Sequence, residues 1–433
     1  MKINYSKEIP VVKKYDVIVV GGGPSGICAA VAAAREGATT ALIERYGIIG
    51  GNMTAGHVGP IEGVVGKGTM RDEIVKLLGV PDNDMLGHTG LVHDMEKAKA
   101  VLPKFVSDAG VDIYLQSPVI DVIINDKVVS GVIIGWKTGM FALMAKTIVD
   151  ATGDGDVAFF SGAEYEFGRE IDGLTQPVTL EFTVTGVDES CAVDCVGDVD
   201  ERLYKGERFL DFTKRCAGEG ILPKNVTTIR THKTVTPGER CINATQSNGI
   251  NALDTKDIIK AELELRDQIM IVVDFLRKYV DGYANCRVIS SSVTLGVRET
   301  RRIIGQYILQ DSDLASGRKF EDVVVHNANF IVDIHNPIGG GQAEEKIEYV
   351  KPYDIPYRCL VPKGVDGLIL TGRCISGTHR AHASYRITSI CLALGQAAGV
   401  SAALCAKNNV LPRNIDYRLI QEALTSKGVE LFD

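Results

Sequence analysis

The feature that most constrains this chain is an apolar strand that breaks into a glycine turn and continues as a helix. The run Tyr15-Asp-Val-Ile-Val-Val-Gly-Gly-Gly-Pro-Ser-Gly26 is followed by small residues that predict a helix from Ile27 to Arg35. A second apolar strand is then expected to end at Glu44. This strand, turn, helix and strand order is typical of a βαβ unit that binds a nucleotide.

Each glycine of the turn has a physical role in such a unit. Gly21 permits the tight turn, Gly23 lets the backbone approach a pyrophosphate, and Gly26 lets the helix pack on the strand. The N-terminus of the helix offers N–H groups to phosphate. Glu44 lies about 20 residues beyond the turn, where an acid accepts hydrogen bonds from a ribose. The alternative is a merely tight βα loop, which explains neither the spacing nor the acid.

The residues after Glu44 favour one dinucleotide over the other. Glu44-Arg-Tyr-Gly-Ile-Ile-Gly-Gly-Asn-Met-Thr54 adds the glycine pair Gly50 and Gly51, where an NAD-binding domain usually continues into helix. This favours FAD. The segment resembles the start of flavoproteins in the glutathione-reductase superfamily, in which such a pair lies along the pyrophosphate and the ribityl chain.

Later segments extend the resemblance across nearly the whole chain. Thr147–Asp154, Gly367–Cys374 and Gly395–Gly399 resemble the segments that return to FAD in that superfamily. Four further motifs resemble one branch of it, the family of FAD-dependent oxidoreductases: Gly296–Arg302, Asp333–Pro337, Ile355–Arg358 and His379–Arg386.

The resemblance implies an α/β fold, with a Rossmann-like FAD-binding domain of the glutathione-reductase type and a large inserted α+β substrate domain. It also implies that the backbone near Gly395 stabilises anionic reduced flavin. The expected FAD-binding residues are Gly21, Gly23, Pro24, Ser25, Gly26, Glu44, Arg45, Gly50, Gly51, Asn52, Met53, Val119, Ala151, Thr152, Gly153, Asp154, Gly372, Arg373, Arg386, Gly395, Gln396 and Ala397.

The pattern of apolar residues predicts four parts. Residues 1–160 form the first part of the FAD-binding domain, and 161–351 form the inserted substrate domain, with a strand at Val178–Val184 and a long amphipathic helix at Thr255–Val280. Residues 352–409 return to the FAD-binding domain, and 410–433 form a helical tail. Apolar residues make up 45% of the 433, which is enough for two cores.

Composition excludes several partners. A formal net charge of −8 without basic clusters argues against a nucleic-acid partner. None of the ten cysteines forms a Cys-x-x-Cys motif, so neither a redox dithiol nor a metal site is expected. The N-terminus lacks the apolar core of a signal peptide, which predicts a cytoplasmic location. The uncharged stretch Ile387–Ala406 is rich in small residues and predicts a buried helix, not a membrane span.

Histidines provide the first candidates for proton transfer beside the flavin. His379 and His382 lie three residues apart ahead of the final helix, and imidazole titrates near neutral pH. Asp333 and His335 would share one face of a strand, so the carboxylate could orient the imidazole; alternatively both are turn residues. His57 follows the glycine pair, and covalent attachment of flavin through it is conceivable.

Arginines provide the second set of candidates. Arg298 and Arg302 share a face if their segment is helical, whereas Arg298 pairs with Thr300 if it is a strand. Either arginine could clamp a substrate carboxylate or offset charge on reduced flavin. The alternative is a buried pair between an arginine and Glu299 that joins the insertion to the core.

These observations predict an FAD-dependent oxidoreductase that transfers a hydride between a small polar substrate and flavin, with a histidine moving the proton. The alternatives are a flavin-dependent reductase of an activated alkene, similar to fumarate reductases, and an electron-transfer flavoprotein subunit. The electron donor or acceptor and the substrate are not identified by the sequence, and a homo-oligomer remains open.

Overall fold

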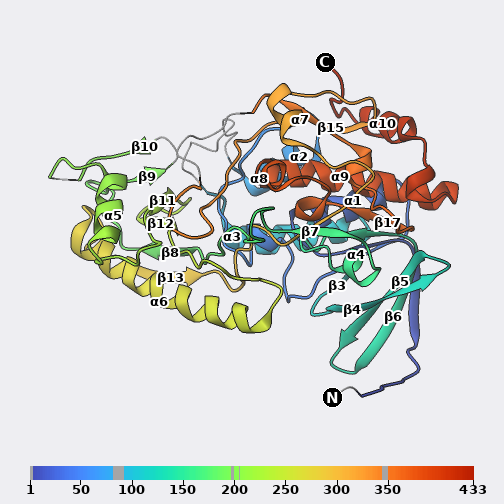
Figure 1. The fold of residues 1–433 in the computed structure, drawn as a ribbon, viewed down its shortest axis with the longest axis horizontal. Coiled ribbons are helices and arrows are strands. Elements are labelled where there is room, and N and C mark those ends of the chain that lie inside the picture. The colour runs from blue at the N-terminus through green and yellow to red at the C-terminus, as the bar shows by residue number, and fades with distance from the viewer. Residues whose placement is uncertain (1–2, 81–91, 197–198, 204, 344–349) are drawn as a thin grey trace.

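A seven-stranded sheet belongs to the larger lobe of the molecule, on the right in Figure 1. The computed structural model describes residues 3–80, 92–196, 199–203, 205–343 and 350–433. The strand order is β3 (Asp112–Tyr114), β2 (Thr40–Ile43), β1 (Val11–Val20), β6 (Gly139–Asp150), β5 (Val128–Trp136) and β4 (Val119–Asn125), and β17 (Leu368–Leu370) also pairs with β6. Pairings among β3, β2, β1, β6 and β17 are parallel, whereas β4, β5 and β6 are antiparallel.

Two helices pack against this sheet and against each other. α1 (Pro24–Arg35) follows β1, and α9 (Thr388–Asn408) comes from the far end of the chain. The uncharged stretch predicted to be a buried helix is α9: it is long and apolar enough to cross a membrane, but 94% of its most apolar window is buried inside the protein. Small residues allow this burial, because a Cβ added at Gly399 would lie 2.1 Å from the carbonyl oxygen of Ala29.

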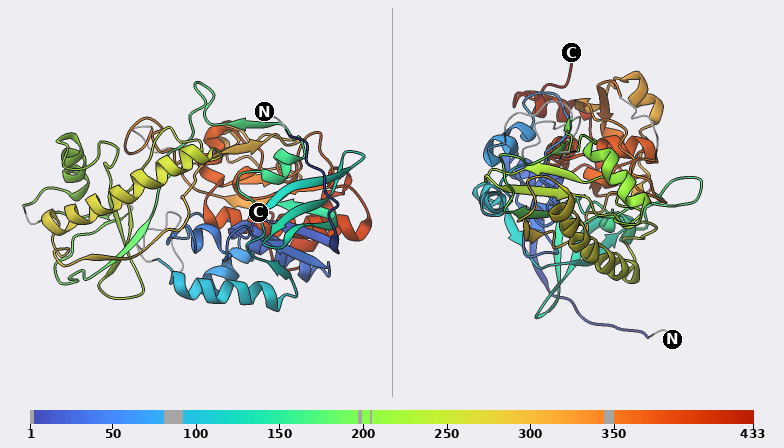
Figure 2. Two further views of the ribbon diagram at one scale, coloured as in Figure 1. Left: turned by 90° about the horizontal axis from the view of Figure 1, so that it is seen from below. Right: turned by 90° about the vertical axis from the view of Figure 1, so that its left-hand side faces the viewer.

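A second hydrophobic core belongs to the inserted part of the chain. Its antiparallel sheet has the order β11 (Arg230–Lys233), β12 (Glu239–Asn243), β8 (Phe182–Thr185) and β13 (Arg287–Ser291). Helices α5 (Phe209–Gly218) and α6 (Thr255–Tyr279) contribute buried side chains to this core. Figure 1 and the left view of Figure 2 show this lobe beside the main sheet, with α6 in yellow.

The remaining elements connect and cover these two units. The helices are η1 (Gly51–Met53), α2 (Met70–Leu78), α3 (Met95–Asp108), α4 (Asp156–Phe160), α7 (Asp311–Ser316), η2 (Tyr357–Cys359), η3 (Gly372–Cys374), α8 (His379–Tyr385), η4 (Pro412–Asn414) and α10 (Tyr417–Thr425). The strands are β7 (Tyr165–Phe167), β9 (Cys195–Val196), β10 (Val199–Asp200), β14 (Arg301–Ile303), β15 (Val323–Ala328) and β16 (Tyr353–Pro356).

The predicted fold class is confirmed, with differences in detail. The second core takes its buried residues from 178–286, with partly buried residues up to Val297 packed against it, whereas Ile303 and later residues pack into the first core. We therefore propose that the inserted unit is this shorter segment and not all of 161–351. The predicted strand Val178–Val184 is regular only as β8, because Val178 and Thr179 form isolated bridges to separate segments.

Candidate active site

A pocket lies where the parallel strands of the main sheet end. Val20 at the end of β1, Ile43 at the end of β2, Ala151 after β6 and Gly372 after β17 all line it. The carboxyl ends of parallel strands meet at one edge of a sheet, which is the usual place for a ligand in this class of fold. The pocket has a volume of about 270 Å³.

Most of the expected FAD-binding residues line this pocket. They are Gly21, Gly23, Pro24, Ser25, Glu44, Arg45, Gly51, Asn52, Val119, Ala151, Thr152, Gly153, Asp154, Gly372, Arg373 and Arg386.

The glycine turn leaves room for a ligand on one side only. A Cβ at Gly21 would lie 2.4 Å from the carbonyl oxygen of Ala151, and one at Gly26 would lie 1.8 Å from the carbonyl oxygen of Gly21. A Cβ at Gly23 would meet nothing within 4 Å. Gly23 precedes α1, whose N-terminus has no side-chain cap and no acidic residue in its first turn. The N–H groups there are therefore free to receive phosphate oxygens.

Glu44 is fixed beside this turn. It is 6% exposed, and its two carboxylate oxygens accept hydrogen bonds from the N–H groups of Gly22, at 2.7 Å, and Tyr46, at 2.9 Å. Each carboxylate oxygen has further lone pairs. The carboxylate can therefore also accept from ribose hydroxyl groups.

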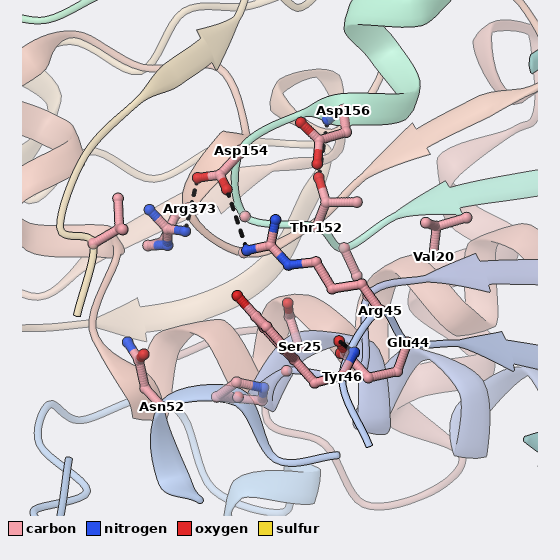
Figure 3. Close-up of a pocket in the computed structure, with 18 of the residues that line it drawn as sticks. Val20, Ser25, Glu44, Arg45, Tyr46, Asn52, Thr152, Asp154, Asp156 and Arg373 are labelled. Atoms are coloured by element: carbon pink, nitrogen blue, oxygen red, sulfur yellow. Dashed lines mark hydrogen bonds and ion pairs between the residues drawn. The ribbon is translucent and has the colours of Figure 1, made fainter. Parts of the chain in front are cut away.

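Two arginines converge on Asp154 from two sides (Figure 3). Arg373 Nη2 lies 3.1 Å from one carboxylate oxygen, and Arg45 Nη2 lies 3.9 Å from the other. Two buried guanidinium nitrogens, Nη1 of Arg373 and Nε of Arg386, have no hydrogen-bond partner in the part of the chain that the structure describes. Both residues line the pocket. A glycine cradle, a ribose acceptor and unpartnered cationic donors fit a cofactor with two phosphates.

Six expected FAD-binding residues lie outside the pocket lining. Gly26 serves packing, Gly50 donates its N–H to the carbonyl of Gly22, and Met53 accepts from His93. The other three, Gly395, Gln396 and Ala397, lie inside α9, where Gly395 contacts α1 and Gln396 accepts from the N–H of Met70. Their predicted contact with flavin is therefore not supported. The N-terminus of α9, at Thr388, lines the pocket instead.

Two of the five catalytic candidates, Arg302 and His379, contact the buried carboxylate of Glu299 and do not line the pocket. Glu299 is 1% exposed and pairs with Arg302 and with His379, whose Nδ1 lies 2.8 Å away. Arg302 also donates to the carbonyl of Gly377. His382 is 1% exposed, and burial lowers its pKa well below the usual value. This group corresponds to the buried Arg–Glu pair that the sequence analysis weighed against catalysis.

The other two candidates lie together beside the pocket. Asp333 accepts from Arg386 at 2.8 Å, and His335 Nε2 lies 3.4 Å from the same carboxylate oxygen. Burial lowers the pKa of His335, and the positive charge of Arg298 lowers it further, whereas the Asp333 carboxylate raises it. Burial also disfavours the Asp333 carboxylate, but His335 and Arg386 outweigh it and hold its pKa well below the usual range. Arg386 joins this group to the pocket.

Two acidic residues of this group were not found from the sequence. Burial, followed by the charge of Asp333, raises the pKa of Glu62 to about 7. Burial raises the pKa of Glu181 to about 8, partly offset by Arg298. Glu181 is the only charged residue of the apolar run 178–184, which was a usable signal. Glu62 gives a comparable signal, because it is the one Asp, Glu, Lys or Arg between Arg45 and Lys67.

His57 lies outside the pocket lining and is hydrogen-bonded to a residue of the inserted sheet. Its Nε2 lies 2.8 Å from Thr183 Oγ1, and burial lowers its pKa to about 4. The structure therefore gives no support to covalent attachment of flavin through His57.

Comparisons with known proteins find relatives of this chain. Thiamine thiazole synthase of Pyrococcus horikoshii is 32% identical over 151 residues, which cover 32% of this chain and 58% of that protein. Digeranylgeranylglycerophospholipid reductase of Thermoplasma volcanium is 28% identical over 172 residues, which cover 36% of this chain and 41% of the relative. The chain thus spans 58% of the length of the first of these relatives and 41% of the second.

Among solved structures, a geranylgeranyl bacteriochlorophyll reductase-like protein of Thermoplasma acidophilum is 16% identical with a TM-score of 0.49, covering 96% of this chain and 84% of that one. The family described as FAD dependent oxidoreductase matches residues 16–424. The chain therefore belongs to the FAD-dependent oxidoreductase family, and its cofactor is FAD.

Proposed function

We propose that this protein transfers a hydride between a small polar substrate and the flavin, with the substrate held by the group that contains Arg298, Asp333, His335 and Arg386. The observation that carries this proposal is the position of these polar side chains. Arg386 belongs both to this group and to the pocket lining. His335 and Asp333 retain 23% and 15% side-chain exposure, so a small molecule can reach them.

FAD supplies the two-electron acceptor or donor when it is bound. The residues of the chain then have to orient the substrate and move a proton. His335 is suited to accept the proton from the substrate, because its Nε2 faces Asp333 and its pKa lies below the usual value. It is therefore neutral at neutral pH and can act as a base. In the reverse direction its protonated form would donate.

A specific observation favours one alternative, the reduction of an activated alkene. Burial, followed by the charge of Arg386, lowers the pKa of Arg298 to about 10. An arginine with a lowered pKa is a better proton donor than an ordinary one. In this alternative Arg298, and not His335, would supply the proton to the substrate.

Anaerobic reduction of the purified holoprotein tests the proposal. Alcohols, hydroxy acids and amines are added in turn, and loss of flavin absorbance is followed. Bleaching by one of these classes supports hydride transfer from substrate. If none bleaches the flavin, but dithionite-reduced protein is reoxidised by an activated alkene such as fumarate, the alternative is supported. Reoxidation only by a partner protein would contradict both and favour an electron-transfer subunit.

The variant His335→Asn distinguishes proton transfer by His335 from proton transfer by Arg298. We expect it to slow the hydride-transfer step by roughly 100-fold or more while FAD stays bound. His379→Asn is the control, because His379 lies at Glu299 and outside the pocket lining. Equal rates in both variants would remove His335 from the proposal. The cytoplasmic location and the oligomeric state remain predictions.

A further inference from the structure

Arg298 carries a charge that has no acidic partner. Its Nη1 donates to the carbonyl of Pro177 at 2.8 Å, and it forms no ion pair in the part of the chain that the structure describes. Its Nε and Nη2 donate no hydrogen bond to the described residues. The side chain is partly buried, so water compensates its charge only in part.

Asp333 and Glu181 act on the charge of Arg298, but neither forms an ion pair with it among the described residues. Asp333 is bound by Arg386 and faces His335, so one negative charge serves two neighbours. Glu181 is 3% exposed, and a thiol S–H, that of Cys241, is directed at its carboxyl group. Its pKa of about 8 keeps it mostly uncharged at neutral pH.

A count of fixed charges shows what is missing. Arg298 and Arg386 contribute two positive charges, and Asp333 contributes one negative charge. Glu62, with a pKa of about 7, contributes at most a partial negative charge near neutral pH. A buried charge without a partner is costly, and a well-oriented anion removes that cost. The group therefore has room for one more negative charge.

We propose that the substrate carries a carboxylate, which binds to the free edge of the Arg298 guanidinium. This inference rests on the proposed function, because it places the substrate in the same group of residues. Nη1 is held by Pro177, so Nε and Nη2 remain as a parallel pair of donors, and such a pair matches the two oxygens of a carboxylate. A dianion such as sulfate or phosphate fits less well, because the group lacks only one negative charge.

Ligand binding to the oxidised holoprotein tests this inference without any turnover. Acetate and propionate, which have no hydroxyl or amino group to oxidise, are titrated, with acetamide and propionamide as neutral counterparts and sulfate as the dianion. Changes in flavin absorbance and heat by calorimetry give two independent readouts. We expect the carboxylates to bind with saturation and the amides to bind much more weakly.

Substitutions of Arg298 assign the binding to this residue. Arg298→Met should weaken carboxylate binding by roughly 10- to 100-fold, and Arg298→Lys should recover part of it, because lysine keeps the charge without the paired donors. Arg277→Met is the matched control: Arg277 lies on α6, donates to the carbonyl of Cys286, and should leave binding unchanged. Arg298→Gln is a second test that keeps a donor for Pro177, in case the methionine variant does not fold.

Three results would overturn the inference: equal binding of amides and carboxylates, no carboxylate binding in the millimolar range, or undiminished binding in Arg298→Gln. Sulfate binding tighter than that of either carboxylate would also overturn it. Failure of the proposed function gives a different pattern. In that case carboxylates bind and depend on Arg298, but no donor or acceptor changes the redox state of the flavin.

Discussion

The contact between α1 and α9 makes a sharp prediction about Gly395. A Cβ added at this position would lie 2.1 Å from the carbonyl oxygen of Ser25, and a backbone atom cannot rotate away. Overpacking costs about 1–3 kcal/mol, and the alanine gains about 1 kcal/mol in helix propensity. Because the clash is severe, we expect Gly395→Ala to lower the free energy of unfolding by about 2 kcal/mol. Ser25 lines the pocket, so FAD affinity should fall with it.

Two other glycines provide matched controls. A Cβ at Gly399 would also lie 2.1 Å from a backbone oxygen, but that of Ala29, which does not line the pocket. Gly399→Ala should therefore lose similar stability with a smaller loss of FAD affinity. A Cβ at Gly218, in the last turn of α5, meets nothing within 4 Å, so Gly218→Ala should be neutral or slightly stabilising.

Thermal unfolding followed by flavin fluorescence, together with FAD titration of the apoprotein, measures both effects. A melting temperature lowered by several degrees, with weaker FAD binding, is the expected result for Gly395→Ala. If this variant matched Gly218→Ala in both measurements, the close contact of the two helices would be refuted.

Three further predictions concern charged groups. Arg302→Met should lower the free energy of unfolding by about 3–5 kcal/mol, because it leaves Glu299 buried without its ion pair to an arginine. The protein that still folds should keep its rate of flavin reduction. An unchanged melting temperature would contradict the predicted loss of stability. Arg373→Met should weaken FAD binding by roughly 10-fold, measured by titration of the apoprotein, because Arg373 lines the pocket and holds Asp154. The pKa of Glu181 is raised from 4.5 to about 8 in the folded protein. Between these two pH values the folded protein keeps a proton that the unfolded chain has released. The free energy of unfolding of the wild type should therefore decrease as the pH rises from 4.5 to about 8. Glu181→Gln should remove this fall in denaturant titrations across pH, and an unchanged slope would show that burial does not shift this carboxyl group.

The nucleotide-binding half could be predicted from the sequence because its signals are local. The apolar run of β1, the glycine turn and the acid at Glu44 all lie within one βαβ unit, and together they indicate where the pocket forms. The later segments that bring Asp154 and Arg373 to the pocket could be predicted only through the resemblance to flavoproteins.

The chemical half could be predicted less well, because it depends on contacts between distant segments. Arg298 and Arg302 are close in sequence, but only Arg302 belongs to β14 and turns toward Glu299. The same carboxylate draws His379 away from the pocket. Glu62 and Glu181 owe their raised pKa values mainly to burial, which their isolated positions among uncharged residues suggest, but the sequence does not show that they lie beside Asp333 or Arg298. Asp333 and His335 do face each other, although they lie outside any strand.

The order of the chain in the main sheet has a consequence for biosynthesis. β1 and α1 are synthesised well before two of their packing partners, β6 and α9. The side of α1 that packs on α9 therefore stays uncovered until α9 has been translated. The cofactor domain cannot complete its fold before that point, although its first strand and helix are made more than 300 residues earlier.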